Sequence, residues 1–180
     1  MKGVVFNIVE EVITDQLSVA AWDAVLHAAE VSGAYTAVGT YPDDELTRIV
    51  AAAGRVTGMT DDDVLRFVGI HGFRGLADRV PDVMRGMRHW VDVLVDLDRI
   101  IHAEVRMLYP DAIVPGFVAT LQPDGVLLRY TSKRSMCALA DGLAVGAGKW
   151  FGRELAVDHV TCARRGDIDC TLLVREAADR

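Results

Sequence analysis

The spacing of apolar residues changes at Pro110, and this change constrains the fold more than any other feature of the sequence. Before Pro110, apolar residues recur every three or four positions, which is typical of amphipathic helices. After Pro110, apolar and polar residues alternate in short runs on either side of a turn, which predicts β-hairpins. The sequence therefore predicts helices over 2–14, 18–33, 41–58, 60–81 and 87–110, hairpins over 116–134 and 155–176, and a helix over 135–152 between the hairpins.

The predicted helices carry recognisable start and stop signals. Ser18 and Thr60 are expected N-caps, because a short hydroxyl side chain can accept a hydrogen bond from the first turn. Pro42 is expected in the first turn of the third helix, and Gly33 near the end of the second. The fold class is therefore α+β, with several helices followed by a small antiparallel sheet that one helix interrupts.

Size and charge limit the functions that the chain can have. Its 180 residues, 51% of them apolar, suit one domain over 1–180 with a large core. The net charge of −7 and the lack of a long basic run argue against nucleic acid as a partner. The sequence has no apolar stretch long enough for a transmembrane helix, and Glu10 and Glu11 interrupt any signal peptide. We expect a cytoplasmic protein, away from membranes, with reduced cysteines.

Tyr130, Ser132 and Arg134 stand at every second position of the first hairpin. Alternate side chains of a β-strand point to the same face, so we expect these three donors to meet in one place. The sequence offers no matching acceptors nearby. The carboxylates of a bound cofactor would supply them, since a guanidinium binds a carboxylate bidentately and hydroxyls add neutral hydrogen bonds. A solvated strand face would have the same spacing.

His102 lies in the longest predicted helix, at the edge of its apolar stripe. A neutral imidazole in apolar surroundings is a good axial ligand for iron, and a rigid helix fixes its approach. A core histidine bonded to a carbonyl would occupy the same position. Asp98 and Arg106 lie one turn before and one turn after it, as in an ordinary ion pair on a helix surface, and we assign neither to a metal site. The apolar stripe consists of Leu94, Leu97, Ile101, Val105 and Leu108.

The order of these features resembles one family. The opening "MKGVVFNIVEEVI", a helical His102, Pro115 and the Tyr-x-Ser-x-Arg of "YTSKR" are similar to the H-NOX domains, which sense nitric oxide or oxygen with haem. The resemblance implies haem b between a helical subdomain (about 1–64) and a haem-anchoring subdomain (about 65–180). It implies His102 as the proximal iron ligand and Pro115 pressing on the porphyrin. It also implies that Tyr130, Ser132 and Arg134 hold the propionates.

The expected gas ligand follows from the helix over 135–152. Oxygen-binding relatives carry a tyrosine on this helix, whereas here Leu139 stands at what we take to be that position. Bound oxygen needs a hydrogen-bond donor, so an apolar pocket favours nitric oxide, with carbon monoxide also accepted and oxygen poorly held. His71 is the one polar residue that would change this expectation, and a structural or surface role for it is the simpler one.

The three cysteines form a second candidate site. Cys137, Cys162 and Cys170, together with His159, make a Cys₃His set, which suits a closed tetrahedral zinc site. Three small buried side chains without metal are the alternative. Bacterial nitric-oxide-type H-NOX members have zinc ligands in this order, so the resemblance favours zinc. Release of zinc on thiol oxidation is a further hypothesis.

The leading interpretation is a haem-based sensor without catalytic activity that binds nitric oxide at ferrous haem. No nucleophile with a supporting base is evident, and no distal acid–base pair of a peroxidase. The family resemblance implies a separate partner, either a histidine kinase or a cyclic-di-GMP enzyme. The alternative is a haem-free small-molecule-binding or zinc-stabilised interaction module on a related fold.

Overall fold

The computed structural model describes residues 1–177. It confirms the α+β prediction, with helices in the first part of the chain and both hairpins after residue 115. The helices are α1 (Gly3–Gln16), α2 (Val19–Ala29), α3 (Asp43–Thr57), α4 (Asp61–Asp78), α5 (Pro81–Arg85), α6 (Trp90–Asp96), α7 (His102–Leu108) and α8 (Cys137–Trp150). The strands are β1 (Gly116–Gln122), β2 (Gly125–Thr131), β3 (Leu155–Thr161) and β4 (Cys170–Glu176). Within the described residues, no helix combines the length and the apolar character that a bilayer crossing requires.

Two of the helix starts follow from capping that the sequence predicted. The Ser18 hydroxyl accepts a hydrogen bond from the Ala21 amide, and Thr60 forms a reciprocal capping box with Asp63, as expected. Two details of the prediction were wrong. Helix α2 ends at Ala29, because Glu30 adopts a left-handed conformation (φ 55°) before Gly33 is reached. Pro42 precedes α3 with extended ψ (140°) instead of lying in its first turn.

The long helix predicted over 87–110 is interrupted. Helix α6 passes at Leu97 into a single π-helical turn, Leu97–Ile101, and α7 begins at His102. A π turn inserts an extra residue into a helix and thereby rotates the residues that follow it. The apolar periodicity continues through the turn, so the sequence pattern did not reveal it.

The four strands form one antiparallel sheet in the order β1-β2-β4-β3. Strands β1 and β2 pair around the expected turn, from Gly116 opposite Thr131 to Gln122 opposite Gly125. The second hairpin turns through a short 3-10 helix (Ala163–Arg165) and a left-handed Gly166, also as expected. The side chains that the sheet buries with residues of α8 include Val126, Leu128, Tyr130, Leu172 and Val174.

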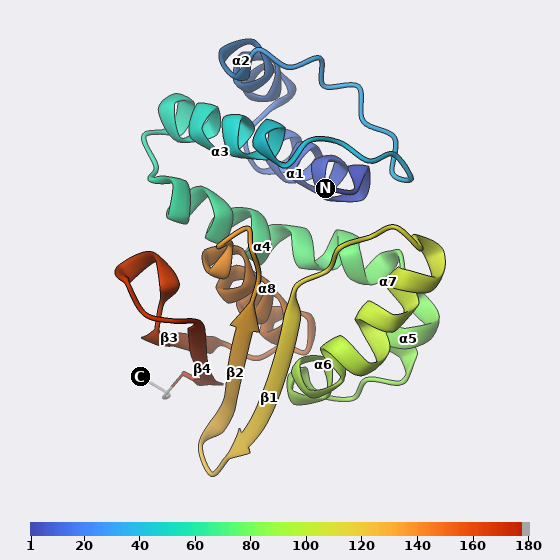
Figure 1. Ribbon diagram of the computed structural model, residues 1–180, viewed down its shortest axis with the longest axis vertical. Coiled ribbons are helices and arrows are strands. Elements are labelled where there is room, and N and C mark those ends of the chain that lie inside the picture. Colours follow the sequence, from blue (N-terminus) through green and yellow to red (C-terminus); the bar gives the residue numbers. More distant parts are fainter. Residues whose placement is uncertain (178–180) are drawn as a thin grey trace.

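Helix α4 lies between two parts of the molecule. In Figure 1, α1, α2 and α3 form a layer on one side of α4, whereas α8, the sheet and α5 to α7 lie on the other side. Val64 and Val68 of α4 belong to the core of the helical layer, and Phe73 and Ala77 belong to a core shared with α8. The boundary expected near residue 64 therefore falls within the first turns of a helix that serves both parts.

Glycines allow α4 and α8 to cross closely. A Cβ on Gly142 of α8 would lie 2.1 Å from the Arg66 carbonyl oxygen, and one on Gly69 of α4 would lie 2.6 Å from the Leu139 carbonyl oxygen. Only glycine at both positions permits this approach. The close crossing fixes the position of α8, and so of Leu139 and Leu143, relative to the helical layer.

Candidate functional site

A cavity of about 360 Å³ lies between the helical layer and the part of the molecule that carries the sheet. Its volume is within the range of small-molecule sites, roughly 300 to 1,000 Å³. Helices α1, α4, α6, α7 and α8 and strands β1 and β2 all contribute to its walls. Most of the lining is apolar, including Val5, Leu97, Ile101, Phe117 and Leu143. Polar groups are few, so a ligand of mainly apolar surface fits the cavity.

His102 lies on the wall of this cavity, as the first residue of α7. Its side chain is only 12% exposed, and its Nδ1 lies 3.2 Å from Oδ1 of Asp98 in the π turn. Arg106 donates to the same oxygen at 3.1 Å. The contact with Asp98 leaves Nε2 as the ring nitrogen that is available to a ligand. Sequence reasoning left Asp98 out of the site, although its position four residues before a helical histidine was a usable signal.

The environment of His102 favours the neutral imidazole. Burial lowers the pKa of His102, and the hydrogen bond to Asp98, together with that carboxylate's charge, offsets the effect only in part. The Pro115 carbonyl acts in the same direction as Asp98. A neutral ring keeps a lone pair on one nitrogen, which is the form that binds a metal.

Tyr130, Ser132 and Arg134 all line the cavity, but they do not lie on one strand. Strand β2 ends at Thr131, so Ser132 and Arg134 belong to the turn that follows, and the prediction of an alternating strand face was wrong for these two. The Tyr130 hydroxyl is close to this turn and accepts a hydrogen bond from the Met136 amide at 3.2 Å. Burial raises the pKa of Tyr130, so the hydroxyl stays protonated.

The acceptors that the sequence did not reveal are present in the fold. The Arg134 guanidinium donates to Oδ2 of Asp43 at 2.8 Å and to the Ile113 carbonyl at 2.7 Å. The Ser132 hydroxyl accepts from the Arg134 amide at 3.1 Å. Asp43 begins α3, and hence Arg134 links the cavity rim to the helical layer across 91 positions of the sequence. The expectation that the chain lacks partners for these donors was wrong.

The remaining residues predicted around the cavity fall into two groups. Pro115 and Leu139 both line it, Pro115 just before β1 and Leu139 from α8. His71 is not among the cavity-lining residues of the described chain. It stacks instead on Phe67, with ring centroids 4.5 Å apart. The structure thus agrees with a structural role for His71.

The three cysteines come together away from the cavity. Their sulfur atoms all lie within 4.8 Å of one another, and all three residues are buried. Burial raises the pKa of Cys137 to about 12. Burial also acts to raise the pKa of Cys162, but backbone amides, that of Arg164 first, and the Cys137 thiol lower it by more, so the net change is downward. Three clustered sulfurs, one of them with a lowered thiol pKa, are a donor set that suits a soft metal such as zinc.

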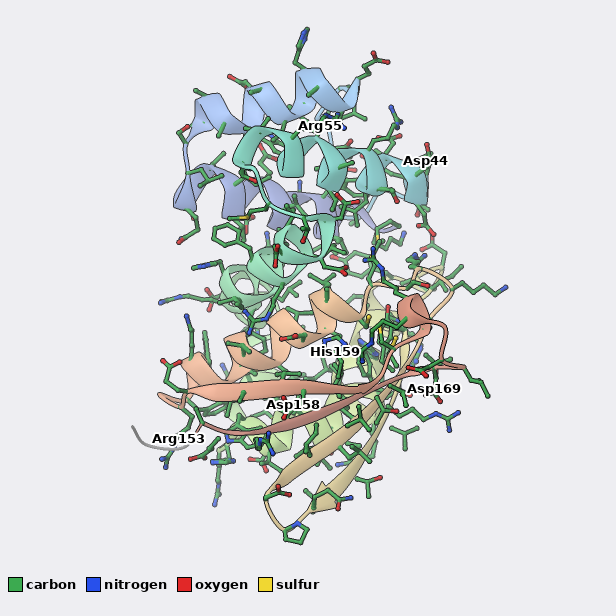
Figure 2. All side chains as sticks on the ribbon, turned by 90° about the vertical axis from the view of Figure 1, so that its left-hand side faces the viewer. Asp44, Arg55, Arg153, Asp158, His159 and Asp169 are labelled. Atoms are coloured by element: carbon green, nitrogen blue, oxygen red, sulfur yellow. The ribbon has the colours of Figure 1, made fainter. Side chains whose placement is uncertain are left out.

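His159 does not join the sulfurs in this arrangement. Its Nε2 lies 3.1 Å from Oδ2 of Asp141, whose Oδ1 accepts from Nε of Arg66 at 3.0 Å. Asp141 is 8% exposed and connects α4 to β3 through α8. Figure 2 shows His159 on β3, beside the terminal hairpin turn. No sequence pattern pointed to this triad, because Arg66 and Asp141 are 75 residues apart.

The comparison with known families decides the identity of the fold. The model of the haem-NO-binding family matches residues 2–159, most of the chain. The chain belongs to the H-NOX family. The H-NOX fold is a haem-based gas-sensor fold, and its members are sensors, so the predicted resemblance is confirmed. Among curated proteins, none matches this sequence.

Solved H-NOX structures superpose on nearly the whole chain. An H-NOX protein from S. oneidensis in the Fe(II)NO ligation state is 29% identical, with a TM-score of 0.90, and the match covers 98% of this chain and 99% of that one. A mutant of an S. oneidensis H-NOX protein in the Fe(II) state is 30% identical, with a TM-score of 0.92, covering 100% and 98%. An H-NOX protein from K. algicida, 23% identical over 99% and 98% of the chains, shares the fold at a TM-score of 0.83.

Proposed function

We propose that this H-NOX domain is a nitric oxide sensor that holds haem b in the cavity and has no catalytic activity of its own. One observation carries the proposal: a histidine side chain that is only 12% exposed and a group of polar donors line the same apolar cavity. Haem requires this combination, because its ring is apolar, its iron binds imidazole and its propionates bind cationic and hydroxyl donors.

The residues present fit such a group. Nε2 of His102 would be the axial ligand, and Tyr130, Ser132 and Arg134 would hold the propionates. Pro115, which lines the cavity just before β1, would press against the ring. When bound, the haem supplies an iron with a coordination position for a diatomic gas.

The apolar character of the α8 wall supports nitric oxide as the gas. Leu139, Ala140, Leu143 and Ala144 of α8 line the cavity, and none of them offers a side-chain donor. These α8 residues would therefore offer no hydrogen bond to oxygen, which needs a donor to be held. Nitric oxide and carbon monoxide do not depend on such a donor.

Signal transfer would use the boundary between the two parts of the molecule. The cavity touches α1 on one side and β1 and β2 on the other, and the Arg134–Asp43 ion pair joins the cavity rim to α3. A change in the position of His102 would therefore alter the contacts across the cavity, and these contacts determine how the helical layer is oriented relative to the sheet. The separate partner would be a histidine kinase or a cyclic-di-GMP enzyme, as the family resemblance implies.

The absorption spectrum of the purified, reduced protein tests this proposal. We expect a Soret band that shifts on addition of nitric oxide. His102→Gly should lose the band and recover it when imidazole is supplied. His71→Gly is the matched control and should keep the band, because His71 lies outside the cavity lining. A wild-type protein that stays colourless after haem addition would favour the haem-free binding module instead.

We also propose zinc at the cysteine cluster, with Cys137, Cys162, Cys170 and His159 as ligands. The three sulfurs are already gathered, whereas His159 would have to turn from Asp141 toward them. Such a site would pin the terminal hairpin to α8 and contribute to folding. Elemental analysis should find one zinc per chain in the wild-type protein. Cys170→Ser should lose this zinc, and His159→Ala should contain less of it. The exposed His27→Ala is the control, and unchanged zinc in His159→Ala would rule out the histidine as the fourth ligand.

A further inference from the structure

We propose that Asp98 is the positioning residue for His102, and that Arg106 moderates its effect. Asp98 would hold the imidazole with Nε2 available to the cavity and increase its strength as an iron ligand. This inference rests on the proposed function, since it concerns how the haem iron is held. It starts from the π turn, which interrupts the helix immediately before His102.

The π turn and the first turn of α7 bring three charged or titratable groups together. Asp98 lies inside the turn, His102 follows four residues later, and Arg106 follows after four more. Oδ1 of Asp98 is 3.2 Å from Nδ1 of His102 and 3.1 Å from a terminal nitrogen of Arg106. A single carboxylate oxygen is thus shared between the imidazole and the guanidinium.

The contact with Asp98 favours one tautomer of His102. A carboxylate can only accept, so Nδ1 must carry the proton, and the lone pair is then on Nε2. Without this contact, the proton of the neutral ring could lie on either nitrogen. Histidine ligands of metals commonly donate their second N–H to a carboxylate, which fixes the ring orientation and raises the basicity of the ligand. Asp98 occupies that position here.

Arg106 acts in the opposite sense to Asp98. Its positive charge on the shared oxygen draws electron density away from the bond to His102, so the imidazole gains less basicity than from Asp98 alone. The side chains of Asp98 and Arg106 are 41% and 47% exposed, which keeps both effects moderate. Asp98 and Arg106 together would therefore make His102 a stronger iron ligand than a histidine with no carboxylate partner, but a weaker one than a histidine paired with Asp98 alone.

The functional consequence concerns the sensor's threshold. A more basic imidazole would bind the haem iron more strongly and would be harder to displace. Asp98 and Arg106 together would set how easily His102 is released. Neither residue needs to contact haem or gas to do this.

Resonance Raman spectroscopy of the ferrous, gas-free holoprotein measures the iron–histidine stretching frequency directly. Asp98→Asn should lower this frequency, because the amide carries no negative charge. Asp98→Glu keeps the carboxylate and should leave the frequency near the wild-type value. Arg106→Leu should raise it, since Asp98 then serves His102 alone. Asp96→Asn is the matched control: Asp96 lies two positions before Asp98 but pairs with Arg99, so its substitution should leave the frequency unchanged.

The two substitutions are expected to shift the iron–histidine frequency in opposite directions, whereas a general loss of structure would not produce opposite shifts. A lower frequency in both Asp98→Asn and Arg106→Leu, or no change in Asp98→Asn, would overturn the inference while leaving the haem-sensor proposal intact. The reduction potential of the iron is the second measurement, and we expect Asp98→Asn to raise it and Arg106→Leu to lower it. Wild-type protein without any iron–histidine band would refute the proposed function, and this inference with it.

Discussion

Asp141→Ala tests whether the buried triad stabilises the crossing of α4, α8 and β3. Asp141 is the charged residue that lies buried within residues 1–177, and its carboxylate accepts from Arg66 and contacts His159. Removing it leaves both partners without their acceptor. We expect the protein to keep its fold and its cavity, and to unfold more easily.

The size of the effect follows from the exposure of the two partners. A hydrogen bond to a charged group contributes about 1.5–3 kcal/mol. The Arg66 side chain is 44% exposed and will be rehydrated, so its share falls to about 0.2–1 kcal/mol. In zinc-free protein, where His159 keeps its contact with Asp141, this side chain is 21% exposed and its share is larger, about 1–2 kcal/mol. The expected loss is therefore about 2 kcal/mol, or a Tm lower by about 4–8 °C for a chain of this size.

Thermal and urea unfolding followed by circular dichroism measure this loss. The matched control is Asp158→Ala, which removes an aspartate next to His159 on β3 in Figure 2. Asp158 is 54% exposed and pairs only with Arg175 in the described structure, so its loss should change stability by less than about 1 kcal/mol. A double-mutant cycle with Arg66→Met should show a coupling energy between Arg66 and Asp141.

A stable Asp141→Ala protein would refute this reasoning. Desolvation of a buried carboxylate can exceed what its hydrogen bonds contribute, and the substitution would then be neutral or stabilising. Equal losses in Asp141→Ala and Asp158→Ala would also contradict it, because burial would then have no role.

Three further predictions concern the cavity and the helix crossing. Arg134→Ala should raise the haem dissociation rate about 10-fold to 100-fold, because it removes a charged contact, whereas Ser132→Ala should raise it at most about 10-fold. Equal dissociation rates in the two variants would contradict the assignment of these residues to the propionates. Leu139→Tyr should introduce a stable oxygen complex, visible by absorption spectroscopy, and no complex would mean that Leu139 is not placed over the iron. Gly142→Ala should lower the Tm measurably, since its Cβ would lie 2.1 Å from the Arg66 carbonyl and helix overpacking costs about 1–3 kcal/mol; an unchanged Tm would show that the helices separate freely.

Much of the fold could be predicted because the relevant signals are local. The Thr60 capping box and the two hairpin turns depend on residues a few positions apart, and all lie where the sequence indicates. The early end of α2 at Glu30 was missed because a left-handed glutamate leaves no compositional mark. The π turn at Leu97–Ile101 was missed because the apolar spacing continues through it.

The sequence predicted which residues line the cavity, but it predicted less well where they lie in the fold and which groups they contact. His102, Pro115 and the Tyr130, Ser132, Arg134 series all reach one cavity, although only Tyr130 lies on the strand. The partners of these residues were not predicted. Asp43 meets Arg134 across the boundary between the helical layer and the sheet.

The sequence by itself determined the kinds of elements, their order and the family, because periodicity, caps and the Tyr-x-Ser-x-Arg motif are written in short stretches of chain. Only the tertiary structure decided which groups meet. The contacts of Arg134 with Asp43 and of Arg66 with Asp141 span 91 and 75 residues. Such pairs depend on how closely whole helices pack, and the missing Cβ atoms at Gly69 and Gly142 are what allow α8 to approach α4.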